Sequence, residues 1–249
     1  MNRVAIVSGA AQGLGLAFAQ RLVDEGYSVL GMDVNSDVES IAGITGVVAD
    51  VSKRADVERV VEQAAEMGTI HVVVNNAGTW QKTPVESSWE QTLIDLDFIT
   101  ETNIKGVMLL SRAAVPHLKK SGGHIINLSS YYVLPAKSDG TNPPDTDLYN
   151  ASKWALNGFT DAWAKSLEKD NVCVNGMCMG AVDTPMLRGL FPNNELPASL
   201  ASQVMSPEAI AQQMMDIINS GRTGENFGAW VGEDIQLGAV PPLHKRITG

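Results

Sequence analysis

Val4-Ala5-Ile6-Val7-Ser8-Gly9-Ala10-Ala11-Gln12-Gly13-Leu14-Gly15 joins a short apolar run to a cluster of glycines near the start of the chain. The apolar run predicts a buried strand, and the pattern Leu14–Glu25, which ends at Gly26, predicts a helix. Glycines at such a turn let the backbone approach a pyrophosphate, which the helix N-terminus attracts. The spacing is Gly-x-x-x-Gly-x-Gly rather than the common Gly-x-Gly-x-x-Gly, so a merely structural turn is the alternative.

The alternation of short apolar runs and longer helical patterns continues along the chain. Nearly continuous apolar runs are typical of parallel strands that helices cover on both faces. The alternation predicts a doubly wound, Rossmann-type α/β fold with a mainly parallel sheet of about seven strands flanked by helices. We expect one NAD-binding domain over residues 1–249, with the substrate site on its C-terminal half. The expected strands are Val4–Val7, Ser28–Met32, Gly46–Ala49, His71–Asn75, His124–Leu128 and Val172–Met177.

The later helices have recognisable ends. Lys53–Met67 is expected to begin at Ser52 as its cap and to stop at Gly68. A long pattern, Trp89–Leu118, reads as a helix that is broken, and Ser206-Pro207-Glu208 opens another, with serine as cap and proline at the first helical position. Tyr149–Glu168 is the remaining long helix.

Composition excludes several classes of function. The chain has 249 residues and a net charge of -10, which argues against nucleic acid or an anionic membrane as a partner. No apolar run approaches the about 18 residues of a membrane helix, and the first one is too short for a signal peptide. Cys173 and Cys178 are expected to be buried free thiols of a cytoplasmic protein. Four histidines lack the spacing of metal ligands, so we expect no metal: His71, His117, His124 and His244.

An acidic residue, Asp33, stands at the end of the second strand. At about 20 residues past the glycines, it is placed to accept hydrogen bonds from the adenosine ribose hydroxyls. Its carboxylate would repel a 2′-phosphate, and neither the glycine turn nor Asn35-Ser36-Asp37 offers a basic residue. This favours NAD over NADP, with a strand-end aspartate capping the next turn as the alternative. Asp50-Val51 could reach the adenine edge or could simply begin the next helix.

Further polar groups gather at the same edge of the predicted sheet. The fourth strand ends in Asn75-Asn76-Ala77-Gly78 and the fifth in Asn127-Leu128-Ser129-Ser130. The carboxyl ends of parallel strands near the switch point are where such sheets hold ligands. Tyr149 and Lys153 follow, four residues apart and therefore on one face of a helix.

Together and in this order, these pieces resemble the short-chain dehydrogenase/reductase family over essentially residues 1–220. The matching pieces are the glycine turn, Asp50-Val51, Asn75-Asn76-Ala77-Gly78, Asn103, Ser129-Ser130, Tyr149-Asn150-Ala151-Ser152-Lys153 and Asn175 through Thr184. The resemblance implies an NAD-dependent oxidoreductase that interconverts a secondary alcohol and a ketone. It also implies a homotetramer formed through the two long helices.

The resemblance assigns roles residue by residue. Tyr149 is the implied acid/base, Lys153 holds the nicotinamide ribose, Ser130 polarises the carbonyl, and Asn103 anchors a proton-relay water. Ser129 is the competitor of Ser130, but neighbours on a strand face opposite ways and the family register favours Ser130. The implied cofactor-binding residues are Gly9, Gln12, Gly13, Leu14, Gly15, Asp33, Asp50, Val51, Asn76, Ala77, Gly78, Tyr149, Lys153, Gly180, Val182 and Thr184.

The chemistry explains why these residue types belong together. A tyrosine has a pKa near 10, which is too high for a base at neutral pH. A neighbouring ammonium, here that of Lys153, favours the phenolate and moves the pKa toward the working range. A serine hydroxyl can donate to the substrate oxygen, while the cofactor carries the hydride.

Some features depart from the family pattern. Ser130 and Tyr149 are farther apart than usual, and the excess, Lys137–Asp147, either shapes specificity or is a tolerated surface loop. The usual Pro-Gly after the sixth strand is Met179-Gly180, and the tail Asn226–Gly249 matches poorly. Apolar residues that could line a pocket for a cyclic or aromatic alcohol, or could equally be core, are Trp80, Tyr131, Tyr132, Met186, Leu187 and Phe191.

Two other functions use the same fold. A non-catalytic NAD(H)-sensing protein would not need the whole acid/base set, and an epimerase or dehydratase of the wider superfamily usually carries a larger C-terminal substrate domain. Net NADH formation across a panel of alcohols would separate these possibilities.

Overall fold

The computed structural model describes residues 2–133, 144–229 and 236–240, the last of these as backbone only. These residues contain an eight-stranded sheet in the order β3-β2-β1-β4-β5-β6-β7-β8. The strands are β1 (Arg3–Ser8), β2 (Ser28–Asp33), β3 (Thr45–Val48), β4 (Thr69–Asn75), β5 (Gly123–Leu128), β6 (Val172–Met179), β7 (Asn226–Ala229) and β8 (Gln236–Val240).

The sheet confirms the expected Rossmann-type fold. Strands β1 to β7 are parallel, and β8 pairs antiparallel with β7. From β1 the chain winds outward through β2 and β3, and then returns to β4 on the other side of β1. The strand order therefore reverses between β1 and β4, and a crevice forms at such a switch point outside the carboxyl ends of the strands.

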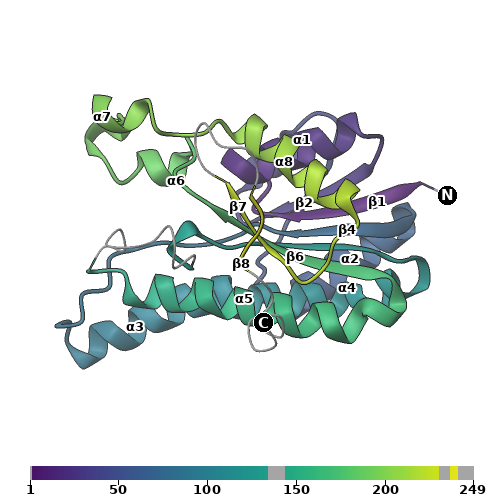
Figure 1. The fold of residues 1–249 in the computed structure, drawn as a ribbon, viewed down its shortest axis with the longest axis horizontal. Coiled ribbons are helices and arrows are strands. Elements are labelled where there is room, and N and C mark those ends of the chain that lie inside the picture. The colour runs from purple at the N-terminus through teal and green to yellow at the C-terminus, as the bar shows by residue number, and fades with distance from the viewer. Residues whose placement is uncertain (1, 134–143, 230–235, 241–249) are drawn as a thin grey trace.

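Helices cover both faces of the sheet (Figure 1). On one face lie α1 (Gly13–Asp24) and α8 (Pro207–Ser220), and on the other lie α2 (Arg54–Met67), α4 (Val107–Ser121) and α5 (Asp147–Leu167). Each face has its own apolar core, since parallel strands bury side chains in both directions. Phe18 and Met214 belong to the first core, and Leu110 and Leu167 to the second.

The long pattern Trp89–Leu118 is indeed broken. It consists of α3 (Trp89–Thr100), a π-helical turn η2 (Glu101–Gly106), and α4. The shorter elements are η1 (Ser36–Ser40), η3 (Tyr131–Val133), η4 (Glu168–Asp170), α6 (Pro185–Arg188), η5 (Pro192–Asn194) and α7 (Ala198–Ala201).

The start of α2 differs from the prediction. The N-cap residue of α2 is Lys53 and not Ser52. The main-chain nitrogen of Ser52 instead donates to Oδ1 of Asp50 (2.8 Å), so Asp50 organises the turn before the helix. The other predicted boundary is confirmed, because Gly68 ends the helix with a φ of 156°.

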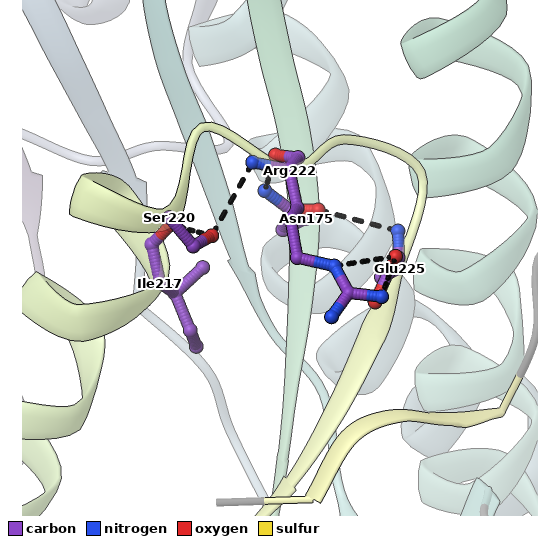
Figure 2. Close-up of polar contacts among 5 residues, drawn as sticks. All are labelled: Asn175, Ile217, Ser220, Arg222 and Glu225. Atoms are coloured by element: carbon purple, nitrogen blue, oxygen red, sulfur yellow. Dashed lines mark hydrogen bonds and ion pairs between the residues drawn. The ribbon is translucent and has the colours of Figure 1, made fainter.

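The turn between α8 and β7 is pinned to the middle of β6 by Asn175, as Figure 2 shows. Nδ2 of Asn175 donates to the Arg222 main-chain oxygen (2.7 Å), and its Oδ1 accepts from the Glu225 main-chain nitrogen (3.2 Å). The guanidinium of Arg222 in turn pairs with the buried carboxylate of Glu225 at 2.6 Å. These contacts set where β7 begins, on a segment that the sequence did not identify as a strand.

The structure also bears on the cysteines, on metal sites and on membrane-spanning helices. Cys173 and Cys178 are both free, although Cys173 is only half-buried. Within residues 2–133, 144–229 and 236–240, no cluster of side chains has the composition of a metal site. Of the helices described, none is long and apolar enough to cross a membrane.

Candidate functional site

The glycine turn is built so closely that side chains are excluded from it. Gly9 and Gly13 have φ values of +67° and +57°, a region that L-residues rarely adopt. A Cβ on Gly15 would lie only 1.8 Å from the main-chain oxygen of Gly9. Gly15 therefore lets α1 begin directly against the turn, and Gly9 and Gly13 let the turn curl over the end of β1.

Two side chains lock this turn to the end of β4. Nδ2 of Asn76 donates to the main-chain oxygens of Ser8 (2.9 Å) and Gly9 (3.1 Å). The Ser8 hydroxyl accepts from the main-chain nitrogens of Asn76 (3.0 Å) and Ala77 (3.1 Å). Sequence reasoning missed this role of Ser8; the only available signal was a hydroxyl placed directly after a buried apolar run.

Asp33 has the capping role that was one of its two readings from the sequence. Its Oδ1 accepts from the main-chain nitrogen of Asn35 (3.0 Å), so it does cap the next turn. Its Oδ2 accepts from the main-chain nitrogen of Ala11 (2.9 Å), which ties β2 to the glycine turn. The same residue lines the main cavity. Asp50 likewise organises the turn before α2 and lines that cavity.

The cavity has a volume of about 370 Å³ and runs along the carboxyl edge of the sheet. The predicted site residues that line it are Gly9, Gln12, Gly13, Leu14, Asp33, Asp50, Val51, Asn76, Ala77, Gly78, Tyr149, Lys153 and Thr184. The predicted residues that do not line it are Gly15, Asn103, Ser130, Gly180 and Val182.

Two of the predicted residues that do not line the cavity, Gly180 and Val182, fix the segment that follows β6. The main-chain nitrogen of Gly180 donates to the Ala229 oxygen (2.9 Å), and Val182 forms a parallel bridge with Met205. Both therefore fasten this connection to neighbouring segments. Thr184 lies on the cavity and caps α6, because its hydroxyl accepts from the Leu187 nitrogen (3.3 Å).

Tyr149 and Lys153 lie one turn apart on α5, and both line the cavity. Nζ of Lys153 lies 5.5 Å from the centre of the Tyr149 ring and donates to the Leu128 main-chain oxygen (2.8 Å). Burial lowers the pKa of Lys153 to about 8. Burial also raises the pKa of Tyr149 to about 12, and a hydrogen bond with the Ser130 hydroxyl acts in the opposite direction.

The hydroxyls of the neighbouring residues Ser129 and Ser130 have different hydrogen-bond partners. The Ser129 hydroxyl contacts α5, at the Lys153 main-chain oxygen (3.2 Å) and at Oδ1 of Asn157 (3.3 Å). The Ser130 hydroxyl faces Tyr149 and accepts from the main-chain nitrogen of Tyr132 (3.3 Å). Ser129 thus fastens β5 to α5, whereas Ser130 is the serine in contact with the phenol.

Asn103 lies in the π-helical turn and is 1% exposed. Its side chain is not satisfied by its own helix. Oδ1 accepts from the Thr79 nitrogen (2.8 Å), and Nδ2 donates to the Thr79 oxygen (3.0 Å) and the Ser152 hydroxyl (3.1 Å). Asn103 therefore joins three segments around the site, and π-helical turns are frequent at functional sites.

The substrate side of the site is only partly described. The ring of Tyr132 meets that of Tyr149 edge-on, with centroids 6.2 Å apart, and Tyr131 packs on Tyr132 at 4.5 Å. Met186 lines the cavity, whereas Trp80, Leu187 and Phe191 do not. Most of the Lys137–Asp147 segment lies outside the described residues.

The fold and the cavity define a doubly wound protein of the dinucleotide-binding class. The short chain dehydrogenase family matches residues 3–195. The chain therefore belongs to the short-chain dehydrogenase/reductase family of oxidoreductases, as its motifs predicted.

Relatives and solved structures agree with this assignment. The chain is 33% identical over 237 residues to a diacetyl reductase [(S)-acetoin forming] of Staphylococcus aureus, covering 90% of this chain and 86% of the relative. It is 30% identical over 237 residues to an NADPH-dependent pterin aldehyde reductase of Arabidopsis thaliana, covering 91% and 92%. A 3-ketoacyl-(acyl-carrier-protein) reductase from Brucella melitensis, complexed with NADH, superposes with a TM-score of 0.77 at 26% identity, covering 92% and 97%. A nicotinamide cofactor is supported by these matches.

Proposed function

We propose that this protein is an NAD-dependent alcohol dehydrogenase or carbonyl reductase that interconverts a secondary alcohol and a ketone. The observation that carries the proposal is that Tyr149 and Lys153 line the cavity together, while the Ser130 hydroxyl forms a hydrogen bond with the Tyr149 phenol. An acid/base, a group that can donate to the substrate oxygen, and a cation occur together there.

The residues present fit a dinucleotide. Gly9, Gly13 and Gly15 leave room where a Cβ would meet neighbouring atoms, and a Cβ on Gly78 would point to within 3.7 Å of Nζ of Lys153. The main-chain nitrogens at the start of α1 would hold the pyrophosphate, Asp33 the adenosine ribose, and Lys153 the nicotinamide ribose. When bound, the nicotinamide would supply the hydride acceptor or donor.

The choice of NAD over NADP rests on charge. Asp33 lines the cavity, and of the described residues that line it only Lys153 is basic. A 2′-phosphate beside Asp33 would place like charges together with nothing to offset them. The names of the relatives mention both cofactors, since one is NADPH-dependent and a structural neighbour holds NADH.

The protein's own residues handle the proton. In alcohol oxidation, Tyr149 as phenolate would take the proton from the substrate hydroxyl, and in ketone reduction its phenol would return it. The Ser130 hydroxyl would donate to the substrate oxygen and hold it beside Tyr149. The hydrogen bond with the Ser130 hydroxyl favours the phenolate and counteracts the effect of burial on the pKa of Tyr149.

A cyclic or aromatic small molecule is the substrate class that we favour. The ring of Tyr132 meets that of Tyr149 edge-on, and the exposed residue Met186 lines the same cavity as Tyr149, so apolar surface is available there. By family resemblance, we further propose a single-domain, cytoplasmic homotetramer, which light scattering on the purified protein would test.

Tyr149→Phe tests the proposed reaction. The variant should bind NADH almost as well as the wild type, because only one oxygen is lost, and should show no measurable turnover. Tyr27→Phe is the matched control, since Tyr27 is buried beside Arg3, outside the cavity. The assay would follow NADH absorbance with a panel of steroid, terpenoid, polyol, aromatic and small diketone substrates. Full turnover in Tyr149→Phe would refute the assignment.

A further inference from the structure

The segment Thr79–Thr83, here called the strap, connects the cavity to the first turn of α5. It begins directly after Gly78, which lines the cavity. At its first end, both main-chain polar groups of Thr79 bond to the amide of Asn103, which also donates to the Ser152 hydroxyl on α5. In the middle, Nε2 of Gln81 donates to the buried carboxylate of Asp95 on α3 (2.6 Å).

The far end of the strap is joined to the residues that lead into α5. Thr83 forms a parallel bridge with Thr146, and its main-chain nitrogen donates to the Asp145 oxygen (2.7 Å). Its hydroxyl donates to Oδ1 of Asp147 (2.5 Å) and lies 3.4 Å from the Leu148 nitrogen, from which it can accept. Thr83 itself is 3% exposed, whereas its partner Asp147 is exposed, so these bonds are partly buried.

These contacts replace a local helix cap. The first main-chain nitrogens of a helix have no partner within the helix, and a side chain at the N-cap usually supplies one. The N-cap residue of α5, Thr146, makes no such bond; its hydroxyl accepts from Nδ2 of Asn150 (3.3 Å). The Leu148 nitrogen is instead held by Oδ1 of Asp147 (2.7 Å), the atom that Thr83 fixes in place.

Tyr149 is the residue that follows Leu148. It lies between the two ties that link the strap to α5, one through Thr83 and the other through Asn103 and Ser152. The Ser152 hydroxyl donates to the Tyr149 main-chain oxygen (2.7 Å), so the second tie ends on Tyr149 itself. The start of a helix frays easily, and one tie on each side of Tyr149 restricts the movement of this residue.

We propose that Thr83 is a positioning residue, whose hydroxyl fixes the first turn of α5 and thereby holds the Tyr149 phenol against Ser130. This inference rests on the proposed function of Tyr149. Thr83 itself does not line the cavity, so it would act on the reaction through α5. Its removal therefore acts on the rate of the chemical step, because small misplacements of a reacting group can cost about 10²-fold.

The test compares Thr83→Val, which loses the hydroxyl at nearly constant volume, with Thr83→Ser, which keeps it. Thr160→Val is the matched control, since it removes a fully buried hydroxyl from the same helix, where Thr160 accepts from Asn127 (2.9 Å). We expect Thr83→Val to lower kcat by about 10- to 100-fold. KM for NADH should change less than about twofold, because the glycine turn and β2 build most of the cofactor cavity. Thr83→Ser should retain kcat, and Thr160→Val should lose stability with kcat unchanged.

Amide hydrogen exchange reports on the contact between Thr83 and the first turn of α5 without an activity assay. Thr83→Val should speed exchange in residues 147–151, and Thr83→Ser should not. An unchanged kcat in Thr83→Val, or equal losses of kcat in Thr83→Val and Thr83→Ser, would overturn the proposal. So would unchanged exchange in Thr83→Val. A wild type without turnover on the panel, or an active Tyr149→Phe, would instead refute the proposed function.

Discussion

Lys153 donates a hydrogen bond of 2.8 Å to the main-chain oxygen of Leu128, which links the site on α5 to the last residue of β5. The lysine is 6% exposed, and burial lowers its pKa to about 8. The single carbonyl contact thus compensates only part of the hydration that the ammonium loses.

Replacing Lys153 with Met should stabilise the fold at neutral pH. The unfolded lysine has an ordinary pKa of 10.5, so the folded state releases its proton first as pH rises. Lys153 therefore lowers the wild-type free energy of unfolding most below pH 8. This loss is recovered as the pH rises between about 8 and 10.5. We expect Lys153→Met to raise the free energy of unfolding at pH 7 by up to about 3 kcal/mol, and the difference to shrink by pH 9.5. Urea unfolding at several pH values measures this. Lys165→Met, on an exposed part of α5, is the control.

Asp33 should determine the choice of cofactor. Asp33→Ala removes the proposed ribose acceptor and its negative charge, so kcat/KM for NAD should fall by at least about tenfold, and the ratio of NADP to NAD use should rise. Kinetics with both cofactors provide the measurement. Asp37→Ala removes a nearby exposed charge and should leave the ratio unchanged. A wild-type preference for NADP would contradict the charge argument.

Ser130→Ala should lower kcat by about 10²-fold or more, because it removes the donor beside Tyr149. Ser129→Ala should act mainly on stability, since it removes two buried contacts with α5. Steady-state kinetics paired with thermal unfolding would distinguish the two serines. Equal loss of turnover without loss of stability in Ser129→Ala would reverse the assignment.

Gly15→Ala and Gly158→Ala should have opposite effects. A Cβ on Gly15 meets the Gly9 oxygen at 1.8 Å, so the glycine turn must shift, and we expect both stability and NADH binding to fall. Gly158 lies within α5, and a Cβ added there would meet nothing within 4 Å beyond the helix's own backbone, so alanine should add about 0.5 to 1 kcal/mol of stability. Chemical unfolding and NADH fluorescence titration would report both effects.

The sequence predicted the parts of the fold that depend on local pattern. Strands β1 to β6 were found because their apolar runs are nearly continuous, and an interruption of the long pattern Trp89–Leu118 was expected. Strand β7, Asn226–Ala229, was missed because it is short and contains glycine and asparagine. Its conformation depends on pairing with β6, which is a tertiary effect.

The site was predictable to the extent that its residues belong to recognisable motifs. The cavity unites the glycine turn, Asp33 and the Tyr149–Lys153 pair as expected. Gly180 and Val182 were expected on the cofactor, but the structure places both outside the residues that line the cavity, because the chain beyond β6 turns toward Ala229 and Met205. Thr83 escaped notice since its partners lie more than sixty residues away in the sequence.

The pinned turn at Asn175 has a practical consequence for redesign. It fixes the path into β7 from the interior of the sheet, whereas α6 and α7 stand apart from the sheet (Figure 1). Residues 186–204 can therefore be randomised as a cassette in a selection for new substrates, with Asn175, Arg222 and Glu225 left unchanged. We expect the sheet to keep its fold whichever sequence is selected for residues 186–204.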